Sequence, residues 1–78
     1  MAIALKVGHR VTVKPCADPE RRTGDGTPLA DLAGKRGQVM AVDEARGLVL
    51  VDDQWVTGKA EGPCTMREWI PPDALEVG

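Results

Sequence analysis

The first predicted strand is visible as an alternation of apolar and polar residues. Between Val7 and Lys14, the valines fall on one face and polar side chains on the other: Val7, Val11 and Val13 against Arg10, Thr12 and Lys14. Such alternation is typical of a strand with one buried face. Pro15 ends this strand, because proline has no backbone N–H to donate to a sheet.

A hairpin is predicted in the middle of the chain. Gln38 to Val42 and Leu48 to Asp52 are its strands, and the connection Asp43 to Gly47 has the length and the closing glycine of a hairpin loop. Leu48 to Val51 is apolar without interruption. We therefore expect the second strand of the hairpin to be central, with both faces covered.

The end of the chain predicts two more strands. Cys64 to Ile70 and Leu75 to Val77 are the strands, separated by a turn or one turn of 3₁₀ helix at Pro71 to Leu75, where Pro72 suits a helix start. Residues 15–33 hold three prolines and two glycines and show no period. A loop of this length is typically functional or disordered. The layout predicts one all-β domain over residues 1–78, with five short strands.

Composition and charge narrow the classes of partner. The 78 residues include no Phe and no Tyr, so the core is built from small aliphatic side chains and supplies only about 3–5 kcal/mol of net stability. A protein partner or a homo-oligomer would offset this weakness. The net charge is −2, which argues against nucleic acid as the main ligand, yet residues 1–39 carry a net +3 and residues 40–78 a net −5. Opposite faces of the domain can therefore serve different neighbours.

No pattern in the chain predicts catalysis, a metal or a cofactor. Cys16 and Cys64 are isolated from each other, so a zinc or iron–sulfur site is not expected, and reduced, packed thiols are favoured over a disulfide. His9, the single histidine, is interpreted as a strand-end residue. Asp52 and Asp53 are adjacent, so their carboxylates diverge, and we expect a solvated turn there. Without a signal peptide or a long apolar run, a soluble, cytoplasmic protein with no membrane contact is predicted.

The expected contact surface combines cations with one aromatic side chain. The long loop contains two adjacent arginines, and the glycine-bounded turn before the hairpin contains a second basic pair. This turn lacks the spacing of a phosphate-binding loop. Trp55, beside a loop, is the expected apolar anchor, whereas Trp69 is expected to pack. The predicted partner-binding residues are Arg21, Arg22, Lys35, Arg36 and Trp55.

Three segments together resemble the electron-transport-accessory group of SH3-like barrels. They are Val7-Gly-x-Arg-Val-x-Val13, Leu32-x-Gly-Lys-x-Gly-x-Val39 and Ile70-Pro-Pro-Asp-Ala-Leu-Glu76. The group includes the variable chain of ferredoxin–thioredoxin reductase, the small photosystem I subunit and the C-terminal domain of the nitrile hydratase β chain. The resemblance implies a five-stranded SH3-like barrel with a long loop after the first strand. It also implies a non-catalytic subunit that braces a larger redox or metal-containing enzyme.

Two other resemblances cover less of the chain. Residues 32–52 are similar to a KOW motif, which implies an RNA-binding or ribosome- or transcription-associated module, although residues 15–33 and the acidic total charge depart from that pattern. The length and strand layout also resemble the plasmid-type dihydrofolate reductase, which forms tetramers. That enzyme's pore needs a Val-Gln-Ile-Tyr stretch, whereas this chain has Met66-Arg-Glu-Trp-Ile70 and no Tyr.

Overall fold

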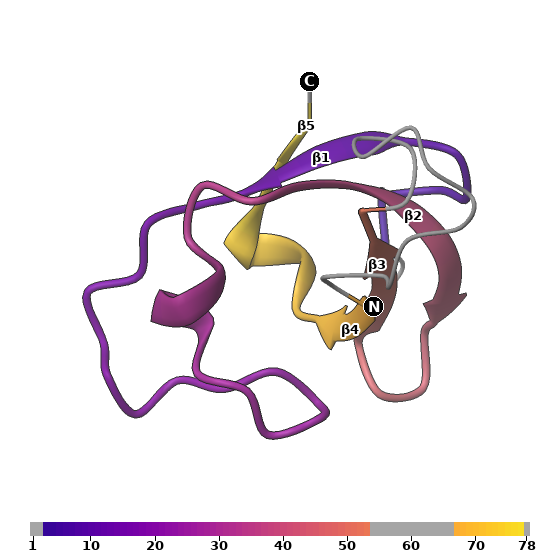
Figure 1. Ribbon diagram of the computed structural model, residues 1–78. Helices are drawn as coiled ribbons and strands as arrows, with labels where there is room; N and C mark the ends of the chain where they lie inside the picture. The colour runs from indigo at the N-terminus through magenta and orange to yellow at the C-terminus, as the bar shows by residue number, and fades with distance from the viewer. Residues whose placement is uncertain (1–2, 54–66, 78) are drawn as a thin grey trace.

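The strands of the protein form one antiparallel sheet (Figure 1). The computed structural model describes residues 3–53 and 67–77. The strands are β1 (Arg10–Val13), β2 (Arg36–Asp43), β3 (Leu48–Asp52), β4 (Arg67–Ile70) and β5 (Leu75–Val77), in the spatial order β4-β3-β2-β1-β5. Two 3₁₀ turns, η1 (Leu29–Leu32) and η2 (Pro72–Ala74), accompany them. The predicted all-β class, the hairpin and the turn before the last strand are confirmed, and the described ranges contain no helix that could span a membrane.

The predicted valine face of the first strand is buried, except at its start. Val11 and Val13 lie in the core, whereas Val7 is 65% exposed. The His9 N–H donates to the Lys6 carbonyl, and Gly8 has a φ of +99°, so the chain turns there. The strand therefore begins at Arg10, three residues later than the alternation predicted. The predicted burial of Val7 is wrong, because the alternation of apolar and polar residues does not reveal a turn.

The sheet has to be strongly curled, because a short segment joins its two edges. β4 and β5 lie at opposite edges, yet only Pro71 to Ala74 connect them, and most of that segment is the turn η2. In a flat five-stranded sheet the edges would be roughly 19 Å apart. A link containing one 3₁₀ turn spans under about 15 Å. The curl also encloses the core.

A bulge in β2 helps the sheet to bend. The pairing of β2 with β3 shifts between Val39 and Ala41, so that Met40 is the extra residue. A bulge bends its strand and increases the local twist. On β3, Val49 and Val51 are fully buried, whereas Leu48 and Leu50 are only half-buried. The expectation that both faces of β3 are covered is therefore met completely on one face and partly on the other.

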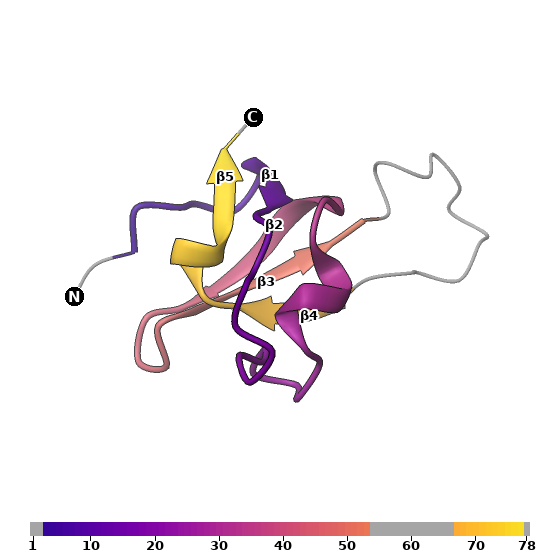
Figure 2. The same ribbon diagram turned by 90° about the vertical axis from the view of Figure 1, so that its left-hand side faces the viewer.

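The long loop after β1 contributes to the core. Within residues 15–33, η1 places Leu29 and Leu32 among the buried side chains of the sheet. The Leu29 N–H donates to the Arg21 carbonyl, and Arg22 and Pro28 form an isolated bridge. The loop is thus a structural part of the fold, and both views show it at one end of the sheet (Figure 2).

We expect Leu29→Ala to lower the free energy of unfolding by about 2–5 kcal/mol, because Leu29 is fully buried and the truncation leaves a cavity. Met40→Ala removes an exposed side chain at the bulge and should cost under about 0.5 kcal/mol. Urea unfolding followed by tryptophan fluorescence measures both values. Equal costs for the two variants would show that the loop does not belong to the core.

Candidate functional site

The predicted contact residues fall on two separate parts of the structure. Lys35 and Arg36 lie at the start of β2 and are exposed. Arg21 and Arg22 lie on the long loop, where Arg21 pairs with Asp73 and Arg22 forms an isolated bridge with Pro28. Trp55 lies outside the described residues. The two basic pairs therefore stand on different segments with different neighbours.

The register of β1 and β2 brings other cations beside Arg36. Thr12 pairs with Arg36, and Arg10 pairs with Gln38. Residues that pair directly across a sheet project from the same face, and alternate residues of a strand do so as well. Arg10, Thr12, Arg36 and Gln38 therefore share the face opposite the core. Each of the two arginines is exposed.

One lysine extends this surface along β1. Lys14 continues the polar side of β1 and is exposed. Lys35 is also exposed, but its carbonyl accepts the Val13 N–H at 2.8 Å, so Lys35 stands opposite core-facing Val13 and not on the face of Arg36. We call this set the basic face; its members are Arg10, Lys14 and Arg36.

Sequence reasoning named only Arg36 of the basic face as a contact residue. Arg10 and Lys14 were assigned to the polar side of the first strand, which is correct, but they were not connected to Arg36. The signal was the strand alternation itself. The missing information was the register, because only the pairing of Thr12 with Arg36 shows that the two stretches are neighbours.

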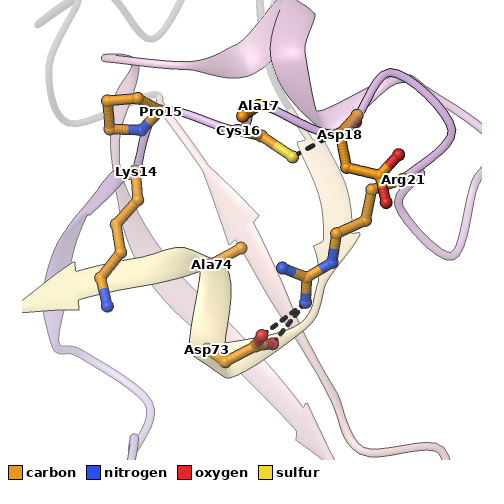
Figure 3. Close-up of a pocket in the computed structure, with 8 residues that line it drawn as sticks. All are labelled: Lys14, Pro15, Cys16, Ala17, Asp18, Arg21, Asp73 and Ala74. Carbon is orange, nitrogen blue, oxygen red and sulfur yellow. Dashed lines mark hydrogen bonds and ion pairs between the residues drawn. The ribbon is translucent and has the colours of Figure 1, made fainter.

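Arg21 ties the long loop to the turn before β5. Its Nη2 donates to both carboxylate oxygens of Asp73, at 2.6 and 2.7 Å (Figure 3). The hydrogen bond to Asp73 raises the pKa of Arg21 above its already high ordinary value. The guanidinium therefore stays charged at every ordinary pH, and the pair is not a pH switch. The Asp73 side chain is largely exposed and the Arg21 side chain is partly exposed, so the pair contributes at most about 1 kcal/mol to folding.

A pocket of about 350 Å³ opens beside this ion pair (Figure 3). Its positive and negative groups balance, and the Lys14 side chain extends away from Arg21 and Asp73. The Cys16 thiol, half-buried and free, donates to the Asp18 carbonyl at 3.5 Å. The predicted packing of Cys16 agrees with this position, while Cys64 lies outside the described residues. The lining residues are Lys14, Pro15, Cys16, Ala17, Asp18, Arg21, Asp73 and Ala74.

The expected solvated turn at Asp52 and Asp53 is wrong. Asp52 is the last residue of β3 and is only 2% exposed, and Asp53 is also buried. Asp52 Oδ2 accepts from Nε and Nη2 of Arg67, at 3.3 and 3.1 Å, across the β3–β4 pair. A buried carboxylate needs such a partner. Sequence alone did not reveal it, because Arg67 is 15 residues away along the chain.

Comparison with known proteins finds no matching family model, no similar curated protein and no similar solved structure. Over residues 3–53 and 67–77, no three side chains of the metal-binding types come together as a possible ion site. The basic face is the candidate site, because its guanidinium and ammonium groups have the donor chemistry that suits anionic groups.

We expect Asp52→Asn to lower the free energy of unfolding by about 1–3 kcal/mol, because the charge-assisted bonds from Arg67 are weakened at a buried position. Asp73→Asn disrupts an exposed pair and should cost under about 1 kcal/mol. Urea titrations of the two variants give the comparison. A larger cost at Asp73 would contradict the assigned roles of the two carboxylates.

Proposed function

We propose that this protein is a non-catalytic accessory module, an SH3-like barrel that binds an acidic surface of a larger partner protein through its basic face. The single observation that carries the proposal is the cross-strand register that sets Arg36 beside Thr12 and Arg10 beside Gln38. The resemblance to electron-transport-accessory barrels makes a redox or metal-containing enzyme subunit the first class of partner to test.

The barrel part of the proposal is supported by strand order and by the short link between the sheet edges. β5 lies beside β1, a long loop follows β1, and η2 precedes β5. This is the layout that the resemblance implies. The short link of Pro71 to Ala74 bends the sheet in the direction that would close a barrel, because it brings β4 and β5 toward each other.

The basic face suits carboxylates for geometric reasons. Arg10 and Arg36 stand on strands, which hold their backbones more rigidly than loops do. A guanidinium presents paired N–H donors that match a carboxylate. Because the chain as a whole has a net charge of −2, a localised basic face orients an approaching acidic partner. These features favour a specific protein surface over a long polyanion.

RNA is the second candidate, because arginines that match carboxylates also match phosphates. The observation that favours it is the proximity of Arg10 and Arg36 on one exposed face, together with the KOW-like hairpin. The acidic net charge weighs against it. Binding through either ligand weakens with salt, so the kind of molecule retained, RNA or protein, separates the two candidates.

We expect the basic-face variant, with Arg10, Lys14 and Arg36 all changed to Ala, to lose partner binding by about tenfold or more at low salt. The reason is the loss of charge-assisted contacts and steering. The immobilised protein and the variant are each incubated with native-host extract. Proteins retained by the wild type are quantified by mass spectrometry, and their contact points are mapped by lysine cross-linking to Lys14 and Lys35.

The matched control is Arg21 and Arg22 changed to Ala, which removes the basic pair of the long loop. Retention by this control and loss in the basic-face variant would support the proposal. The reverse pattern would move the contact to Arg21 and Arg22, which stay predictions of the sequence. Equal retention by wild type and basic-face variant would overturn the proposal. Retention of RNA alone, released by salt, would replace it with the RNA-binding function.

A further inference from the structure

The long loop covers one of the two edges of the sheet and not the other. β4 forms one edge, and the long loop occupies it. The Trp69 carbonyl accepts the Gly24 N–H at 2.8 Å, and the Trp69 N–H donates to Asp25 Oδ2 at 2.7 Å. Both outward backbone groups of Trp69 are thus satisfied. An edge capped in this way cannot accept another strand at that position.

The cap on β4 is held in place by Thr23. Thr23 Oγ1 accepts from the N–H groups of Asp25 and Thr27 and donates to Glu68 Oε1, at 2.9–3.2 Å. Thr23 is buried. Gly24 fits so closely that an added Cβ would lie 3.2 Å from the Trp69 Cβ. The loop therefore covers this edge, and Thr23 and Gly24 are residue types that fit their positions against β4.

The opposite edge is formed by β5, and the register shows which of its groups point outward. The Lys14 N–H donates to the Ala74 carbonyl at 2.8 Å. In an antiparallel pair, hydrogen-bonded and non-hydrogen-bonded pairs alternate. Glu76 and Thr12, two residues further along, therefore exchange hydrogen bonds, whereas the backbone groups of Leu75 and Val77 point away from β1.

One of these outward groups is already used. The Leu75 N–H donates to the Pro72 carbonyl and closes η2. The Leu75 carbonyl and both backbone groups of Val77 remain. Within residues 3–53 and 67–77, β1 is the one strand that pairs with β5, and no backbone bond from a turn or loop reaches these groups. The Val77 side chain is 62% exposed at the same edge.

We propose that β5 is a docking edge that accepts an extended segment of the partner protein as an added strand. The Val77 N–H and carbonyl and the Leu75 carbonyl bond to the added strand. Glu76 projects on the same face as Thr12 and is exposed, so it selects a basic residue in the segment directly beside it. Apolar residues on either side of that basic residue pack against Leu75 and Val77. This inference rests on the proposed function in one respect, that the partner is a protein.

A second copy of this chain fits the edge poorly. When two β5 strands pair antiparallel so that Leu75 faces Val77 of the other copy, Glu76 lies directly opposite Glu76 of that copy. Like charges directly opposite each other destabilise a strand pair. A register shifted to avoid this contact leaves too little of the three-residue strand in the pairing. Charge complementarity therefore selects a foreign segment with a cation.

The test uses the full chain and the peptide acetyl-Thr-Val-Lys-Val-Thr-amide, with the binding followed by amide chemical shifts. The peptide is expected to shift the amides of Leu75 to Val77 and to slow hydrogen exchange at the Val77 N–H. Val77→Pro removes that donor, and proline is tolerated where an edge N–H faces outward. It should weaken binding by about tenfold, while Val77→Thr, which keeps the donor, should bind within about threefold.

A charge-reversal variant gives a second measurement, which does not depend on the Val77→Pro variant. Glu76→Lys should prefer the matching peptide with Glu in place of Lys, and the wild type should show the opposite preference. Shifts confined to other strands, no binding to either peptide, or self-association through β5 on ultracentrifugation would each overturn the proposal. The Lys peptide carries no carboxylate and so does not test the basic face. Failure here is therefore distinguishable from failure of the proposed function, which is measured with proteins of the native host.

Discussion

The connection from Ile70 to Leu75 is the constraint on which the rest of the structure depends. It joins the two edges of the sheet by four residues, and it thereby forces the sheet to curl. The curl gives the small aliphatic side chains an interior to fill. Without aromatic core residues other than tryptophan, the sheet alone encloses little volume. Leu29 and Leu32 of the long loop complete the interior, which explains why the loop is ordered around them.

The outer face of the sheet carries two polar environments. On β1 and β2, cations are exposed. On β3, Asp52 is buried and satisfied by Arg67, so its charge serves the fold. The same strand pairing produces both results, because it decides which charged side chains meet and which remain at the surface. Charge counted along the chain does not distinguish these roles.

The basic face and the β5 edge are neighbours. Glu76 on β5 pairs with Thr12, and Thr12 pairs with Arg36. A partner that docks on the basic face therefore has the open edge within reach, while the capped β4 edge lies on the other side of the sheet. Over residues 3–53 and 67–77, the β4 edge is capped at Trp69 and the β5 edge is open, which restricts strand addition to one place.

The sequence by itself determined the strands, because alternation, glycines and prolines act within a few residues. The hairpin, the 3₁₀ turn at Pro72 and the valine face of β1 were predictable for this reason. The burial of Asp52 and the placement of Arg10 and Arg36 on one face depended on residues distant in the chain. Only the tertiary structure decided them, because register and curl arise from contacts that no local pattern contains.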